Sequence, residues 1–122
     1  MKEIKTEKAP KAQGPYSQGI VSGNTLYISG QLPINPMTGA FAEGGIKAEA
    51  RQTLENILAI AEDFGGIIVR TTVYMKNIDD FALVNEVYAE IFKDIKPSRV
   101  CVGVAQLPKN ANLEIEAIAV KE

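Results

Sequence analysis

The sequence predicts an α+β fold in which two helices lie against one β-sheet. Two stretches carry apolar residues at helical spacing, and the stretches around them are rich in β-branched or alternating apolar residues. The resulting order, β-β-α-β-α-β-β, differs from a regular strand–helix alternation and is typical of the α+β class. The predicted strands are residues 16–21, 25–29, 67–76, 99–105 and 113–121, and the predicted helices are residues 46–64 and 81–93.

The first two strands are predicted to form a hairpin. Gly14-Pro15 breaks the chain before the first strand, and Gly23-Asn24 is a typical turn sequence between the two. Residues 31–45 contain prolines and glycines without apolar periodicity, which predicts a long loop. Long ordered loops in compact domains are often functional, so this one is expected to border a site.

The two helices have clear start or stop signals. Residues 46–64 have apolar side chains on one helical face, and Gly65-Gly66 supplies a stop. The second helix, residues 81–93, follows Asp79-Asp80, whose carboxylates are expected to cap its first turn. Between the helices, residues 67–76 are rich in β-branched side chains and predict a strand.

The last predicted strand has apolar residues on both faces. Ile115, Ala117 and Ala119 point to one side, while Ile118 and Val120 point to the other. A sheet covered by helices on one side only should be polar on its other side. Two explanations remain open: the second face is buried against another subunit, or the strand lies near the centre of the sheet.

Length and composition limit the class of protein. The chain has 122 residues and 46% hydrophobic residues, which predicts one domain, residues 1–122, with an ordinary core. A net charge of −2 argues against a dedicated nucleic-acid binder, and residues 1–13, where lysine alternates with glutamate, are expected to be a solvated segment. No stretch is long and apolar enough for a membrane span, and the single cysteine, Cys101, favours a reducing, cytoplasmic compartment.

The absence of histidine limits the chemistry. Ser-His-Asp and Cys-His nucleophile activation are excluded, and so is every zinc site that contains histidine. No tight cluster of aspartates and glutamates is visible that could hold magnesium. A magnesium site built from carboxylates alone remains open on the residues themselves.

The remaining candidates for chemistry lie on the last two strands. Arg99 and Cys101 share one strand face, and Glu114 and Glu116 share a face of the next strand. The alternatives without function are a surface ion pair for the arginine, a small buried hydrophobe for the cysteine and a solvated face for the glutamates. In the functional interpretation Arg99 binds a substrate carboxylate through two hydrogen bonds and Glu114 handles a water.

Geometry sets a condition on that interpretation. If the last two strands formed a simple hairpin, Arg99 would lie roughly 17 Å from Glu114 along the sheet. Both residues can serve one site only if the strands pair differently or if the site is shared between subunits.

Motifs along nearly the whole chain resemble the RidA (YjgF) family of reactive intermediate deaminases. The matching segments occur in the family's order and make the resemblance specific. They are GPYSQG (14–19), SGQLPINP (29–36), ARQTLEN (50–56), TTVY (71–74), PSRVCV (97–102), LPK (107–109) and IEAIAV (115–120).

The resemblance implies a chorismate-mutase-like fold, with two helices on one face of a single mixed sheet, and a homotrimer with sites between subunits. It implies cofactor-free hydrolysis of 2-aminoacrylate and 2-iminobutanoate to 2-keto acids and ammonia. It assigns Arg99 to the substrate carboxylate and Glu114 to the attacking water. The positions that it assigns to the lining of the substrate pocket are Tyr16, Ser29, Gly30, Asn85 and Cys101.

Three other functions remain open at this point. The same pocket could hold a small carboxylate as a regulator without turnover, or the trimer could act as a holdase chaperone. Endoribonuclease activity, reported for some relatives, fits least because the chain is acidic and lacks histidine. Cys101 is not expected to act as a nucleophile, because no neighbouring base or metal would form its thiolate.

Overall fold

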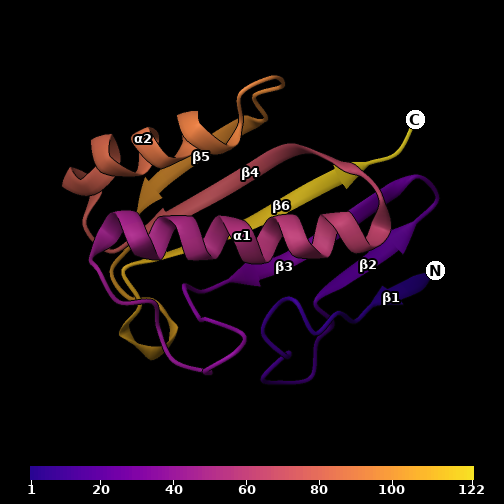
Figure 1. The fold of residues 1–122 in the computed structure, drawn as a ribbon, viewed down its shortest axis with the longest axis horizontal. Coiled ribbons are helices and arrows are strands. Elements are labelled where there is room, and N and C mark those ends of the chain that lie inside the picture. Colours follow the sequence, from indigo (N-terminus) through magenta and orange to yellow (C-terminus); the bar gives the residue numbers. More distant parts are fainter.

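Six strands form one mixed sheet, and two helices cover one of its faces (Figure 1). The computed structural model describes residues 1–122. The helices are α1 (Ile46–Phe64) and α2 (Phe81–Ile91), with short 3-10 turns at Ile78–Asp80 and Pro108–Asn110. The strands are β1 (Lys2–Ile4), β2 (Gly19–Ser22), β3 (Thr25–Gln31), β4 (Ile67–Met75), β5 (Ser98–Gly103) and β6 (Leu113–Val120). The predicted α+β class is confirmed, and the arrangement is consistent with a chorismate-mutase-like fold.

Helix α1 has the predicted bounds because its end is set by a glycine. Gly65 adopts φ 81°, the left-handed conformation that glycine accepts without a steric cost. Its N–H donates to the carbonyls of Ala61 and Glu62, which would otherwise lack partners.

Helix α2 differs from the prediction at both ends. Asp80 makes no capping hydrogen bond with its side chain; instead Asn77 accepts the N–H of Asp79 and caps the preceding 3-10 turn. The helix ends at Ile91, two residues early, because Phe92 leaves the helical conformation with φ −100° and ψ 77°.

The N-terminal segment contains a strand that the sequence pattern did not predict. Strand β1 pairs antiparallel with β2, and the side chain of Ile4 is buried in the core. A three-residue edge strand with one apolar side chain is too short to give an alternating pattern, so the expectation of a wholly solvated segment was wrong. The predicted β2–β3 hairpin is confirmed, with Gly23 at φ 63° in its turn.

The last two strands do not form a hairpin. The sheet order is β1-β2-β3-β6-β4-β5, so β6 lies between β3 and β4, antiparallel to both. Strand β5 lies at the edge and pairs parallel with β4, because α2 carries the chain back to the same end of the sheet. The simple pairing that placed Arg99 and Glu114 roughly 17 Å apart is therefore wrong.

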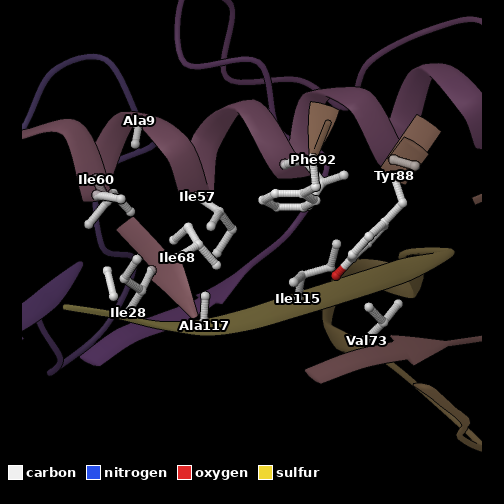
Figure 2. Close-up of a cluster of buried hydrophobic side chains, with 14 of the residues drawn as sticks. Ala9, Ile28, Ile57, Ile60, Ile68, Val73, Tyr88, Phe92, Ile115 and Ala117 are labelled. Carbon is white, nitrogen blue, oxygen red and sulfur yellow. The ribbon is translucent and has the colours of Figure 1, made fainter. Parts of the chain in front are cut away.

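The hydrophobic core lies between the helices and the sheet. In Figure 2, Ile57 from α1 lies above Ala117 on β6, and Ile60 from α1 lies above Ile28 on β3. Ile57, Ile60 and Ile115 are completely buried. Each such side chain contributes about 1.5–3 kcal/mol to folding, which makes this layer the main support of the sheet.

The other face of the sheet is not covered within the chain. Large apolar side chains on it stay exposed, among them Tyr27 at 53% and Val100 at 41%. Ile118 and Val120 also lie on this face and are partly exposed. Strand β6 thus lies near the centre of the sheet, which was one of the two explanations for its apolar residues. Its second face is not covered by any other part of the chain. No helix of the chain is long and apolar enough to cross a membrane.

Candidate functional site

Arg99 lies on the helix side of β5, where α2 surrounds its guanidinium with neutral groups. In the parallel register Arg99 sits beside Thr71, whose side chain faces the helices. The guanidinium donates to Oδ1 of Asn85 at 2.8 Å and lies 5.2 Å and 4.8 Å from the ring centroids of Phe81 and Tyr88. Neither ion pair of the chain involves Arg99, so the alternative of a surface ion pair was wrong.

A cavity of about 480 Å³ opens beside this arginine. Its lining contains two cationic side chains and no carboxylate, which makes it attractive to a small anion. The lining residues are Asn85, Tyr88, Ala89, Phe92, Lys96, Pro97 and Arg99.

Cys101 follows two residues later on the same side of β5. Its Sγ lies 3.6 Å from Sδ of Met75, and the residue is half-buried against the core. Burial raises the pKa of the Cys101 thiol, and the nearby charge of Arg99 offsets this in part. The thiol form is therefore favoured, which argues against a nucleophilic role.

Glu114 lies on the open face, across the sheet from Arg99. Its carboxylate packs directly over Gly30 of β3: a Cβ at that glycine would be 2.7 Å from Oε2 of Glu114. Burial raises the pKa of the Glu114 carboxyl, and the charge of Glu116 raises it further. The neighbouring Glu116 is engaged differently, because its carboxylate accepts a hydrogen bond from the hydroxyl of Tyr74.

Ser29 and Gly30 form a bulge in β3, and Gly30 lies against the Glu114 carboxylate. Ile28 pairs with Ala117 and Gln31 with Ile115, so both residues between them face the single position of Glu116.

Hydrogen bonds from the preceding segment hold this bulge. The Ser29 hydroxyl donates to the carbonyl of Ser17 at 2.6 Å, and the Ser29 N–H donates to the carbonyl of Gln18. Tyr16 is half-exposed and lines a small cavity together with Gly30.

The predicted site residues therefore form two groups on opposite faces of the sheet. Arg99, Asn85 and Cys101 lie on the helix side, whereas Glu114 points to the open face beside Gly30. Arg99 and Glu114 are two strands apart and three register positions apart, or roughly 14 Å between Cα atoms. A single chain does not bring them together.

The sequence interpretation missed the two rings beside Arg99. The second helix was predicted over residues 81–93, but neither Phe81 nor Tyr88 was among the candidate site residues. Their spacing from Asn85, four residues before and three after, places all three on one helical face and was the available signal. No group of three or more carboxylate or thiol side chains gathers where it could hold a metal ion.

Comparison with known proteins identifies the family. The model of a family described as Endoribonuclease L-PSP matches residues 6–121. The chain belongs to this family, the RidA (YjgF) family. A RutC family protein of Pyrococcus horikoshii is 56% identical over the full length of both chains. A 2-iminobutanoate/2-iminopropanoate deaminase of Salmonella typhimurium is 51% identical over 98% of each chain. The crystal structure of the YjgF gene product of Escherichia coli matches over the full length of both chains, with a TM-score of 0.96 and 48% identity.

Proposed function

We propose that the protein is an enzyme that hydrolyses small 2-imino acids, such as 2-iminobutanoate and the imine form of 2-aminoacrylate, to 2-keto acids and ammonia. The observation that carries the proposal concerns the guanidinium of Arg99. It lines a cavity, its own contacts are all with neutral groups, and it is therefore free to bind a carboxylate. The Salmonella relative named as a deaminase, 51% identical over nearly the whole chain, supports the choice of reaction.

The two groups of site residues require more than one subunit. Since Arg99 and Glu114 of one chain face opposite sides of the sheet, a shared site needs the arginine of one subunit and the glutamate of its neighbour. A homotrimer closes such an arrangement with three equivalent sites, because each subunit offers both surfaces. The open apolar face of the sheet supports an assembly of this kind.

In the proposed mechanism Arg99 holds the carboxylate and Glu114 moves protons. The substrate reacts as the iminium ion, with its nitrogen protonated, and an enamine substrate reaches this form by gaining a proton from solvent at its terminal carbon. Glu114 takes a proton from a water whose oxygen attacks the iminium carbon, which gives a carbinolamine with one hydroxyl and one amino group. Glu114 then gives that proton to the amino nitrogen, and the C–N bond breaks. As the C=O bond of the 2-keto acid forms, Glu114 takes the proton of the hydroxyl group and passes it to the departing ammonia, which leaves as ammonium.

The environment of Glu114 suits this exchange. A carboxyl group that both accepts and donates a proton works best when its pKa is close to the working pH. Burial raises the pKa of Glu114 in the isolated chain, and a neighbouring subunit would exclude more water from it. Besides proton transfer by Glu114, the Arg99 guanidinium contributes to the rate by holding the substrate carboxylate in position.

The direct test is release of ammonia and 2-ketobutyrate from 2-iminobutanoate generated in situ by a threonine dehydratase. We expect the wild type to accelerate release and Arg99→Ala to lose roughly 10- to 100-fold, since a hydrogen bond to a charged group is removed. Arg51→Ala is the matched control, because Arg51 forms an exposed ion pair with Glu90 on the helices. Absence of acceleration by the wild type would reject the deaminase and favour a carboxylate-binding role.

A further inference from the structure

We propose that Phe81 and Tyr88 are positioning residues that hold the Arg99 guanidinium between their rings, in the orientation that binds a carboxylate, before substrate arrives. The identity of the carboxylate ligand rests on the proposed function, whereas the holding of the arginine does not. We call Phe81, Asn85 and Tyr88 the arginine cradle.

The geometry of the cradle is that of two cation–π contacts and one hydrogen bond. The Cζ atom of Arg99 lies 5.2 Å from the Phe81 centroid and 4.8 Å from the Tyr88 centroid. Both distances are within the ~6 Å at which a cation is attracted to an aromatic face. Asn85 fixes the remaining freedom of the guanidinium by accepting one N–H at 2.8 Å.

All three cradle residues come from one face of α2, at positions separated by four and three residues. Because Phe81 begins the helix and Tyr88 lies about two turns further, the rings are set at different heights along it, on the side that faces β5. Helix α2 thus supplies all three contacts of the guanidinium, whereas strand β5 carries the backbone of Arg99.

The neutrality of the cradle keeps the arginine charge available. An aspartate or glutamate in place of Asn85 would orient the guanidinium as well, but it would compete with a substrate carboxylate for the same N–H groups. Two rings and an amide orient the group without neutralising it. Arg99 also lines the cavity, where an incoming anion can reach it.

One wall of the cradle is rigid. Tyr88 is 9% exposed, and its hydroxyl forms a hydrogen bond with Thr71, the residue beside Arg99 in the sheet. Its ring also packs against Phe92 at 5.1 Å between centroids.

The other wall is exposed and contributes little to the core. Phe81 is 38% exposed and is not part of the buried cluster. Its contact with Arg99 gives a reason for a large aromatic side chain at the surface, and it makes Phe81 a substitution site that should not threaten folding.

The test uses Phe81→Leu and Tyr88→Phe, with Leu83→Ala as the matched control. Leu83 lies on the same helix and is 38% exposed like Phe81, but its position two residues further along places it on a different helical face from Phe81, Asn85 and Tyr88. The first measurement is the ¹⁵N relaxation order parameter of the Arg99 Nε–H group without ligand, with Arg51 and Arg70 as internal references. The second is the calorimetric affinity for 2-ketobutyrate, the stable keto acid, together with KM and kcat.

We expect Arg99 to be more ordered than the exposed Arg70 in the wild type. Phe81→Leu should lower the order of Arg99, weaken 2-ketobutyrate binding roughly 3- to 10-fold, and raise KM more than it lowers kcat. Tyr88→Phe keeps the ring face but loses the hydrogen bond to Thr71, so it should lower the order of Arg99 less than Phe81→Leu does, and Leu83→Ala should match the wild type.

The proposal is overturned if Phe81→Leu leaves both the order of Arg99 and the affinity as in the wild type, or if Leu83→Ala weakens binding equally. Failure of the proposed function has a different signature: the wild type would not release ammonia from the imine. The order parameter of Arg99 is measured without any ligand, so it still tests whether the cradle residues hold the guanidinium if the deaminase activity is absent.

Discussion

At the scale of single residues, the pairing of Gly30 with Glu114 determines where the carboxylate can lie. The open space above the glycine is filled by the Glu114 side chain, which would meet a Cβ at 2.7 Å from Oε2 and 3.0 Å from its carboxyl carbon. Gly30 does not adopt a positive φ, so alanine would fit the backbone at this position. The glycine is therefore required by its neighbour and not by the chain conformation.

Gly30→Ala should inactivate the enzyme while the protein stays folded. The added methyl group displaces the Glu114 carboxylate by about an ångström, and a shift of that size costs roughly 100-fold in rate. Gly103→Ala is the control, since a Cβ there has an ordinary contact of 3.4 Å with Ile78. Near-normal turnover by Gly30→Ala would show that the carboxylate position is not critical.

The raised pKa of Glu114 also predicts how stability depends on pH. The folded protein holds the Glu114 proton more tightly than the unfolded chain, where the pKa of a glutamate is about 4.3. Stability is therefore highest below the unfolded pKa and falls as the pH rises through the higher folded pKa. Glu114→Gln removes this loss because glutamine does not titrate.

Melting curves at about pH 4 and at neutral pH test this directly. The gain in Tm from Glu114→Gln should be larger at neutral pH than at pH 4, and activity should be lost. A gain that is equal at both pH values would mean that burial does not disfavour the charged form of Glu114.

At the scale of elements, Gln18 ties the N-terminal segment to the rest of the fold. Its Oε1 accepts the N–H of Thr6, and its Nε2 donates to the carbonyls of Thr6, Ala9 and Pro10. The segment after β1 is therefore bound to the start of β2 by the side chain of Gln18, where β1 itself is bound by backbone hydrogen bonds.

Gln18→Leu should lower the free energy of unfolding by about 2 kcal/mol or more, because it leaves partly buried backbone groups without partners. Urea denaturation measures the change, and hydrogen exchange at the Thr6 amide should become faster. A decrease in the free energy of unfolding of less than about 0.5 kcal/mol would mean that water replaces these hydrogen bonds and that Gln18 does not stabilise the fold.

The success of sequence-based prediction also differs between elements. Helix α1 could be predicted because its apolar periodicity and the stop at Gly65 are both local signals. The partners of β5 and β6 could not, since the pairing of two consecutive strands depends on the path of the chain between them and around α2. Strand β1 could not be predicted, because its single buried residue, Ile4, produces no alternating pattern.

The candidate site could be predicted in part. Arg99 and Glu114 stood out as polar residues on strand faces, and the family resemblance gave them roles. The face that each residue occupies follows from the alternation along its own strand, but the distance between them depends on the sheet order, in which β4 lies between β5 and β6, and no local pattern encodes that order. The cradle residues Phe81 and Tyr88 appeared as ordinary helix residues, because their partner is 11 or more positions away in the sequence.

At the scale of the whole molecule, the open sheet face connects the fold to the proposed assembly. The side chains of Tyr27, Val100 and Val102 are exposed and lie on the face that carries Glu114. Burying them against other subunits would stabilise the protein and enclose Glu114 at the same time. Folding, assembly and catalysis then depend on the same surface.

The central claim is that Arg99 and Glu114 of one site belong to different subunits, and complementation tests it most directly. Arg99→Ala and Glu114→Ala, each expected to lose most of its activity when expressed alone, are coexpressed in equal amounts with separable tags. In the proposed trimer, random mixing places an intact arginine beside an intact glutamate in about a quarter of the sites, so about a quarter of wild-type activity should return. If both residues of a site came from one chain, the mixed trimers would stay inactive, and that result would contradict the account.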